Sequence, residues 1–386
     1  MAFTDRLRDF ARNLTRNQKI LIGAGIGVVI VLLATVLALA GGDGGEPEAV
    51  TTTTTSTTRP PTTTTTLPPV APLTGVPEPD AARRDRPALV VKVDNVPQAF
   101  GLQEGIDNAD VVYVEEVENG ATRLAVVFHS KDDTVGPVRS ARTSDLEIVG
   151  NLNMPYFAYS GANGGVLRQV RAGPVIDMGV DRAEATAVYT RNQRGRGLHR
   201  FFFPTDEMYD VGREGAGTPP ALFTYRTAGE SATGEEALGI RIGYGGGAAT
   251  VVNYEWDPAV RGWNRAQNNR AHVMADSGAR IAPKNVVVQF TPYTASEFVD
   301  VTGSRSPESQ MVGEGDAWVF TDGKLIRGRW SRPTRDAVTA FTDATGNVIG
   351  LTPGQTFVEL VPATGSFLGQ GTVTILDPEP APAGGA

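Results

Sequence analysis

Residues 111 to 129 read VVYVEEVENGATRLAVVFH, two strand-like runs joined by an Asn-Gly pair. Asn-Gly is the strongest short signal for a two-residue type I′ turn, so this stretch predicts a β-hairpin. A turn on that pair places Glu116 opposite Arg123 and Glu115 opposite Leu124. Sequence neighbours point to opposite faces of a sheet, so the two glutamates cannot act as one carboxylate pair.

The two glutamates have different environments in this hairpin. Glu116 is interpreted as a cross-strand ion pair with Arg123. Glu115 lies among apolar side chains, where loss of water raises the pKa of a carboxyl group unless a cation reaches it. Such a group is either a general acid or half of a buried ion pair, and Arg139 and Arg142 follow in the sequence. The ion pair is the preferred interpretation of Glu115, and the catalytic role is its alternative.

A strand and an arginine-bearing loop flank the hairpin. Residues 88 to 93 (ALVVKV) predict a buried strand that ends at Asp94. Residues 135 to 152 (VGPVRSARTSDLEIVGNL) predict a Gly-Pro turn, a loop and then a helix. The helix is expected to begin at Ser144, with Glu147 three residues later at the spacing of a capping box.

The loop before this helix is a candidate anion site. Arg139 and Arg142 supply guanidinium groups and the helix start supplies unpaired amides, a combination that suits a carboxylate or a phosphate. Arg123 and Ser144 are further candidate ligand-binding residues. The alternative is that the arginines pair internally with acidic side chains such as Asp145.

The remainder of the first half adds a strand at residues 155 to 160, a helix at residues 164 to 172 and a basic loop that contains His199. The three histidines lack metal-ligand spacing, so no metal site is predicted. Phosphate-loop and nucleophile motifs are also missing from the sequence, so no cofactor is predicted.

Short strands that alternate with turns dominate from residue 219 and predict an antiparallel β domain. The candidate strands are residues 240 to 244, 249 to 256, 262 to 265, 285 to 291 and 356 to 361. The stretch AWVFTDGKLIRGRW, residues 317 to 330, predicts a hairpin on its Asp-Gly pair, with Trp318 opposite Arg327 within cation–π reach. Trp318 and Trp330 are candidate ligand platforms, although core packing is the preferred interpretation of the tryptophans.

The N-terminal part predicts a membrane anchor. Residues 20 to 40 are apolar and uncharged, and as a helix they are long enough to cross a bilayer. Five basic residues precede this run and the next one is Arg59, which predicts a cytoplasmic N-terminus and an extracellular remainder. A cleaved signal peptide is the alternative, because residues 38 to 40 (ALA) resemble a cleavage site. Residues 51 to 69 contain twelve Thr and four Pro, which is typical of an unfolded stalk.

Composition excludes several classes of protein. The chain has 386 residues, enough for about two domains. It has no cysteine, which excludes disulfides, thiolate metal sites, a cysteine nucleophile and a lipidated cysteine. The net charge is -8, and the net +3 of residues 1 to 19 leaves -11 for the rest of the chain. This acidic remainder argues against nucleic acid as a partner.

Five strings in the chain closely resemble the YerB-like family, bacterial surface-anchored proteins with two domains and an unsettled function. The strings are KVDN (92 to 95), ADVVYVEEVENGATRL (109 to 124), VGPVRSAR (135 to 142), GEGDAWVFTDGKLIRGRW (313 to 330) and LTPGQTFVELVP (351 to 362). The resemblance covers both halves of the folded chain and implies no catalytic residue. Family members often carry a lipid-modified cysteine, which this chain lacks. His199 is preceded by Leu and followed by Arg where a Pro-His-Asn string is expected, so the resemblance does not extend to a role for it.

These observations predict a membrane-anchored α+β protein with a mixed α/β domain followed by a mainly antiparallel β domain. The expected segments are a cytoplasmic tail (1–19), a transmembrane helix (20–41), a stalk (42–73), the two domains (74–218 and 219–377) and a disordered tail (378–386).

The favoured function is an accessory envelope protein whose extracellular domains bind wall glycan, peptide stems or a wall-synthesis enzyme. The alternative is a glycan-cleaving enzyme with Glu115 as the acid and Asp94, Glu116 or Asp145 assisting, and His199 is a further catalytic candidate. An enzyme needs Glu115 in an open cleft, whereas a structural role leaves it sealed.

Overall fold

The computed structural model describes residues 68–191, 195, 197–227, 229–245, 249–299 and 303–376. The predicted cytoplasmic tail, transmembrane helix, C-terminal tail and most of the stalk lie outside these residues. Within the described part, no helix has both the length and the apolar character needed to cross a bilayer. Ala71 and Leu73 are buried, so the folded body includes the last residues of the predicted stalk.

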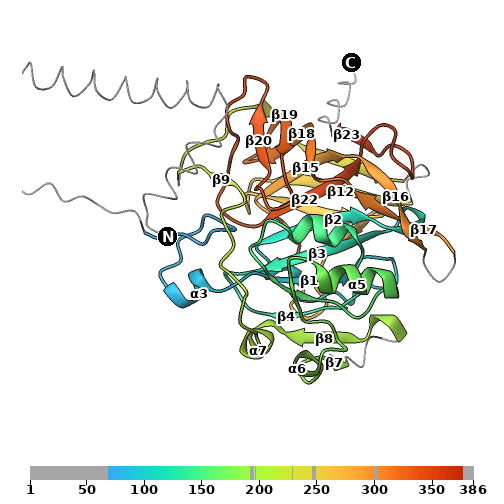
Figure 1. Cartoon of the computed structure of the whole chain (residues 1–386). Coiled ribbons are helices and arrows are strands. Elements are labelled where there is room, and N and C mark those ends of the chain that lie inside the picture. Colours follow the sequence, from blue (N-terminus) through green and yellow to red (C-terminus); the bar gives the residue numbers. More distant parts are fainter. Residues whose placement is uncertain are drawn as a thin grey trace, which may run out of the picture. The chain divides into compact units, whose positions relative to one another are not determined.

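One eleven-stranded sheet runs through the body, and both halves of the chain contribute strands to it (Figure 1). Its order is β10-β19-β18-β15-β22-β2-β3-β1-β5-β6, and β20 pairs with β19. In chain order these strands are β1 (Leu89–Asp94), β2 (Val111–Glu116), β3 (Thr122–Phe128), β5 (Tyr156–Ala158), β6 (Ile176–Asp177), β10 (Glu235–Glu236), β15 (Asn285–Thr291), β18 (Gly313–Thr321), β19 (Lys324–Arg332), β20 (Ala340–Asp343) and β22 (Thr356–Pro362). β22 is parallel to both β15 and β2, so it joins the strands after residue 219 to those before it.

A second, antiparallel sheet has the order β14-β13-β12-β11-β23. Its strands are β11 (Gly239–Tyr244), β12 (Thr250–Asp257), β13 (Gly262–Gln267), β14 (Arg270–Ala271) and β23 (Thr372–Leu376). The strands of the smaller sheets are β4 (Thr134–Val135), β7 (Thr190–Arg191), β8 (Phe201–Pro204), β9 (Thr224–Tyr225), β16 (Tyr293–Val299), β17 (Arg305–Ser309) and β21 (Gly350–Leu351).

Short helices connect the strands. The α-helices are α3 (Ala81–Asp85), α4 (Ser144–Val149), α5 (Gly164–Ala172), α6 (Ala183–Thr186) and α7 (Thr205–Asp210). The 3-10 helices are η1 (Ile106–Asn108), η2 (Glu118–Gly120) and η3 (Gly197–His199).

Each face of the central sheet has its own hydrophobic core. Alternation along β1 sends Val91 and Val93 to one face and Val90 to the other. The first face packs against the second sheet, which contributes Trp263 to the shared core. The other face packs against α4 and α5, and Figure 1 shows α5 lying across β1 and β3, with Val166 buried in that core. This arrangement of a mixed sheet with helices, followed by antiparallel sheets, confirms the predicted α+β class.

The predicted hairpin of β18 and β19 is confirmed. Asp322 and Gly323 have φ of 52° and 74°, the left-handed values that a type I′ turn requires. Trp318 lies opposite Arg327, whose guanidinium is 4.5 Å from the centroid of the indole ring. Local sequence was sufficient here because the turn residues and the strand pattern favour the same register.

The register predicted for the β2–β3 hairpin is wrong by one residue. The connection is a three-residue loop, η2, in place of a two-residue turn. Glu115 therefore lies opposite Arg123, and Glu116 lies opposite Thr122. The predicted cross-strand ion pair of Glu116 with Arg123 does not form, because the shift puts the two side chains on opposite faces of the sheet.

Long-range contacts explain this shift and the absence of the predicted capping box. Glu118 leaves the strand because its carboxylate receives two hydrogen bonds from Arg142. Glu147 does not cap α4, since its carboxylate pairs with an arginine in the loop after β19. The hydroxyl of Ser144 accepts a hydrogen bond from the amide of Ser309 at 3.0 Å, so it serves β17 and not its own helix.

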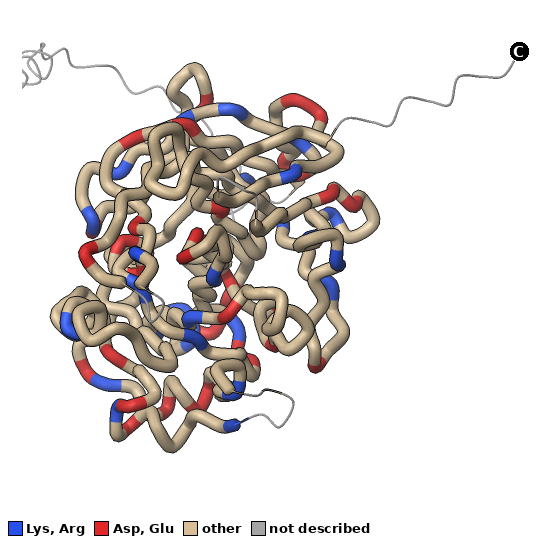
Figure 2. Tube along the Cα trace, turned by 90° about the vertical axis from the view of Figure 1, so that its right-hand side faces the viewer, with Lys and Arg blue, Asp and Glu red and all other residues tan. Residues whose placement is uncertain are grey.

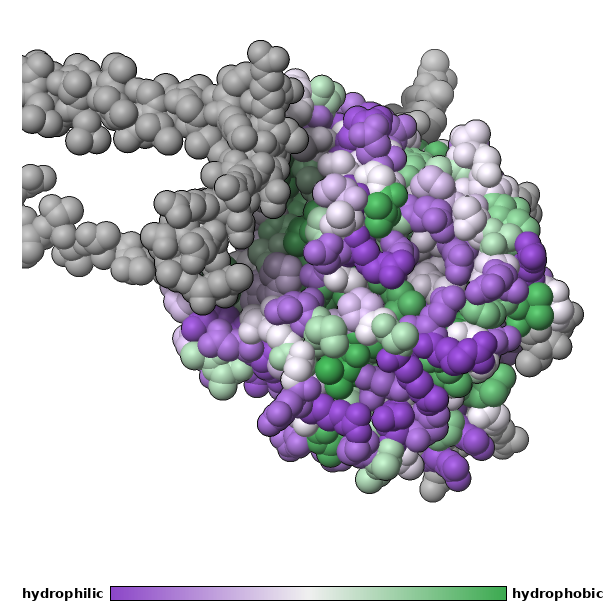
Figure 3. Space-filling model, viewed as in Figure 1, coloured by the Kyte–Doolittle hydropathy of each residue, from purple (hydrophilic) through white to green (hydrophobic). Residues whose placement is uncertain are grey.

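Residues of the two charge signs are not segregated along the described chain. In Figure 2, basic and acidic residues are interspersed along the trace. The face in Figure 3 is largely hydrophilic, with small hydrophobic patches between. Any recognition site is therefore to be sought in local groups of side chains.

Candidate functional site

The candidate residues meet at one end of β1, β2 and β3. Asp94, Arg123 and Glu115 are cross-strand neighbours on β1, β3 and β2, so their side chains share the face that packs against α4 and α5. Lys92 shares this face because it precedes Asp94 by two residues. The loop that carries Arg139 lies beside the end of β1, where Val138 bridges to Val93 and the amide of Arg139 donates to the carbonyl of Lys92 at 2.7 Å.

Glu115 lies in a sealed ion cluster. The carboxylates of Glu115 and Asp145 both contact Nζ of Lys92, which is 2.6 Å from Oδ1 of Asp145, and all three residues are 0% exposed. Burial raises the pKa of Glu115 to about 7, and the charge of Lys92 opposes that shift. The structure thus supplies a lysine where the sequence suggested Arg139 or Arg142 as the partner of Glu115.

A second cluster reaches the surface. Oδ2 of Asp94 accepts a hydrogen bond from Nε of Arg139 at 2.7 Å and lies 2.9 Å from Nδ1 of His199. Asp94 is buried, whereas the side chains of Arg139 and His199 are 15% and 20% exposed. A buried carboxylate therefore orients an arginine and an imidazole that both reach solvent.

Arg123, Arg139 and Arg142 form what we call the arginine cluster. Arg123 is 6% exposed, and no hydrogen-bond partner of its Nε lies in the described part of the chain. Burial, together with the charges of Arg142 and Arg139, lowers the pKa of Arg123 to about 10. The charges of Asp94 and Glu118 act on Arg123 in the opposite direction. Arg142 also acts on the nearby carboxyl group of Glu115.

Arg142 is the most firmly held member of the cluster. Its Nε and Nη2 donate to the two carboxylate oxygens of Glu118 at 2.9 and 2.8 Å. The hydroxyl of Ser306 on β17 contacts the same carboxylate. Burial opposes ionisation of Glu118, but the hydrogen bonds and charge of Arg142 outweigh it and lower the pKa of that carboxyl. The internal pairing that was the alternative for the arginines is thus present, with Asp94 and Glu118 as the acids.

The other candidates lie apart from this site. Glu116 faces the second sheet, and burial raises its pKa to about 7. Trp330 is 1% exposed and its Nε1 donates to a backbone carbonyl at 2.9 Å, so it belongs to the core. Trp318 is half-buried and stacks on Arg327 in the β18–β19 hairpin. Strands β15 and β22 separate this hairpin from β2 and β3, so Trp318 lies away from the arginine cluster.

Sequence reasoning missed Lys92 and Glu118. Lys92 had a usable signal, because a single charge inside the apolar run ALVVKV requires a buried counter-charge. Glu118 had none, since the Asn-Gly pattern assigned it to a strand. Among the described residues, no group of three or more His, Asp or Glu side chains could hold a metal ion.

Comparisons with known proteins agree with this architecture. Residues 73–217 match the family model described as "Protein of unknown function (DUF3048) N-terminal domain", and residues 240–358 match the corresponding C-terminal domain. The crystal structure of the YerB protein from Bacillus subtilis is similar, with a TM-score of 0.65 and 22% identity, over 79% of this chain and 99% of that chain. No curated protein matches the chain significantly. With two family models that together cover most of its length, the chain belongs to the DUF3048 family, whose fold it shares with YerB.

Proposed function

We propose that this protein is a membrane-anchored extracellular envelope protein whose folded body binds an anionic group of the cell wall. The observation that carries the proposal is the arginine cluster, in which three guanidinium groups lie close together and the side chain of Arg139 reaches solvent. A guanidinium fork matches the geometry of carboxylates and phosphates, and partial burial strengthens its interaction with them. Carboxylates of peptide stems and phosphates of wall polymers are ligands of this kind.

Arg139 is the member best placed to contact such a group. Arg139 donates to Asp94 through Nε only. The two Nη groups of Arg139 have no ion-pair partner in the described part of the chain. His199 lies beside it on the same carboxylate. A bound anion would therefore meet an arginine whose orientation is already set, which reduces the entropy lost on binding.

The location outside the cell rests on the N-terminal sequence. Residues 20 to 40 are apolar, and the Thr- and Pro-rich stretch that follows would hold the body away from the membrane. A body held at such a distance is suited to an accessory role in the wall.

The glycan-cleaving alternative loses support from the burial of its acids. Glu115 is closed to solvent and ion-paired with Lys92, and Asp94 and Asp145 are also 0% exposed. Glycan cleavage requires a pair of carboxylates that the substrate can reach. Among the described catalytic candidates, only His199 is both held by a neighbouring carboxylate and partly exposed to solvent.

Pelleting of the full-length protein, purified in a mild detergent, with isolated wall sacculi tests the proposal. We expect Arg139→Gln to reduce the bound fraction about fivefold or more, because one charge-assisted contact is lost. Arg329→Gln is the matched control, since Arg329 is an exposed, ion-paired arginine on β19. Wild-type protein that stays in the supernatant, or equal pelleting of both variants, would contradict the proposal.

A further inference from the structure

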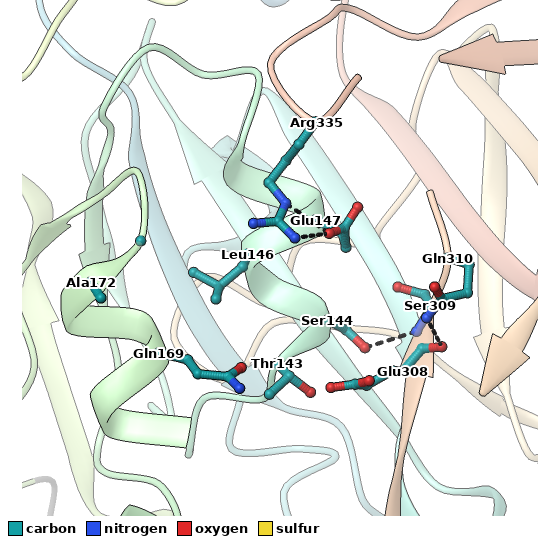
Figure 4. Close-up of a pocket in the computed structure, with 11 residues that line it drawn as sticks. Thr143, Ser144, Leu146, Glu147, Gln169, Ala172, Glu308, Ser309, Gln310 and Arg335 are labelled. Atoms are coloured by element: carbon teal, nitrogen blue, oxygen red, sulfur yellow. Dashed lines mark hydrogen bonds and ion pairs between the residues drawn. The ribbon is translucent and has the colours of Figure 1, made fainter. Parts of the chain in front are cut away.

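A polar pocket of about 450 Å³ lies between α4, α5 and β17 (Figure 4). Gln169 comes from α5, Thr143 directly precedes α4, and Glu308 belongs to β17; the three side chains point toward one another across the pocket in Figure 4. Leu146 of α4 and Ala172 of α5 supply an apolar part of the wall. The volume falls within the range of about 300 to 1,000 Å³ that is usual for small-molecule sites.

The pocket shares two chain segments with the arginine cluster. Thr143 follows Arg142 directly in the loop before α4. On the other side, Ser306 contacts Glu118, the partner of Arg142, and Glu308 follows it by two residues on β17. One extended ligand could therefore contact both places.

The charge of the pocket differs from that of the arginine cluster. Glu147 is held by Arg335, with Nε and Nη2 at 2.8 and 2.6 Å from the same carboxylate oxygen. The carboxylate of Glu308 has no ion-pair partner in the described ranges of the chain. The lining therefore carries excess negative charge, which disfavours an anionic ligand and favours a neutral one.

Several polar side chains that line the pocket can form hydrogen bonds with a ligand. Gln169 can both donate and accept, since only one long contact, 3.5 Å to Glu297, engages its amide nitrogen. Gln310 offers its carbonyl oxygen, because its Nε2 already donates to Thr294 and to the backbone carbonyl of Glu308. With the carboxylate of Glu308 as a further acceptor, this set matches hydroxyl groups and an amide N–H. The hydroxyls of Thr143 and Ser309 are nine-tenths buried or more and have no hydrogen-bond partner among the described residues. Buried polar groups in this state require an explanation, and a bound molecule that supplies their hydrogen bonds is one.

We propose that this pocket binds an N-acetylated hexosamine unit of the wall glycan, with the acetyl methyl group against Leu146 and Ala172. The hydroxyls and the amide of the sugar would then meet Gln169 and Glu308. The inference rests on the proposed function and assigns the neutral glycan to the pocket and the anionic group to the arginine cluster.

Titration calorimetry of the full-length protein in detergent tests this assignment, with the tetramer of β-1,4-linked N-acetylglucosamine as the probe. We expect the probe to bind and cellotetraose, which lacks the acetamido group, to bind at least about tenfold more weakly. Gln169→Ala and Glu308→Ala should each lower the affinity about fivefold, because each removes one polar contact. Gln169 is exposed and Glu308 is half-buried, and circular dichroism checks that the variants fold.

Arg139→Gln separates this inference from the proposed function. It should leave the affinity for the tetramer within about twofold, although it weakens binding to sacculi. Wild-type protein that binds sacculi but not the tetramer would overturn the glycan assignment and leave the proposed function standing. The assignment is also wrong if both pocket variants bind the tetramer normally, or if an isolated stem peptide binds and the pocket variants weaken that binding instead.

Discussion

Replacing Glu115 with glutamine tests the role of the sealed ion cluster. Glutamine keeps the shape of the side chain and a carbonyl acceptor for Lys92, but it fixes the group in a neutral form. Burial raises the pKa of Glu115 from its ordinary 4.5 to about 7 in the folded protein. Between these two values the folded protein holds a proton that the unfolded chain has released, so the stability contributed by this group falls as the pH rises from 4.5 to 7.

The magnitude follows from the size of that shift. One pKa unit corresponds to about 1.4 kcal/mol, so the ionised Glu115 lowers the free energy of unfolding by about 3 kcal/mol above pH 7. Glu115→Gln removes this penalty. We therefore expect the variant to be about 3 kcal/mol more stable than the wild type at pH 8, and equally stable at pH 4.5.

Urea unfolding followed by tryptophan fluorescence at pH 4.5, 6 and 8 measures these differences. Glu314→Gln is the matched control, because its side chain is 73% exposed on β18, and we expect a change below about 0.5 kcal/mol at every pH. A Glu115→Gln variant that is less stable than the wild type at pH 8 would refute the reasoning, since the charge of Glu115 would then be required. A difference that does not vary with pH would refute it equally.

Two further substitutions test contacts that hold the sheets together. Glu359→Ala should lower the free energy of unfolding by about 3 to 5 kcal/mol. The reason is that the buried carboxylate accepts hydrogen bonds from Tyr244 at 2.5 Å and from Tyr254 at 2.6 Å. A loss below about 1 kcal/mol in urea unfolding would contradict this. Gly328→Ala should weaken the pairing of β19 with β20, because the new Cβ would lie 1.9 Å from the carbonyl oxygen of Thr342. We expect faster amide hydrogen exchange confined to β20, and unchanged exchange there would disprove the prediction.

Local sequence predicted where the strands lie, but it did not always predict which residues pair across them. The Asp322-Gly323 hairpin has the register that its turn predicts, whereas the Asn-Gly hairpin is shifted. The two turns have similar sequences, so the difference comes from outside the hairpins. Glu118 is bound by Arg142 and Ser306, and the latter is 188 residues away in sequence. No local pattern contains such a contact.

The sequence likewise predicted the residues of the candidate site but not their arrangement in space. The sequence singled out Asp94, Arg139 and His199 separately, each for its chemistry. Their meeting depends on a loop returning to the end of β1 105 residues after Asp94, as the contact of Asp94 with His199 shows. The pocket beside the site was missed because Gln169 and Glu308 are ordinary surface residue types, and only the packing of α5 beside β17 makes them neighbours.

The position of β22 sets the order in which the protein can be completed. β22 is almost the last strand to leave the ribosome, yet it lies between β15 and β2 in the middle of the central sheet. Until residues 356 to 362 emerge, β2 is an open edge with unpaired backbone groups, the kind of surface through which chains aggregate. Chains that end before residue 356 should therefore be degraded or insoluble, even when all of the strands before residue 219 have been made.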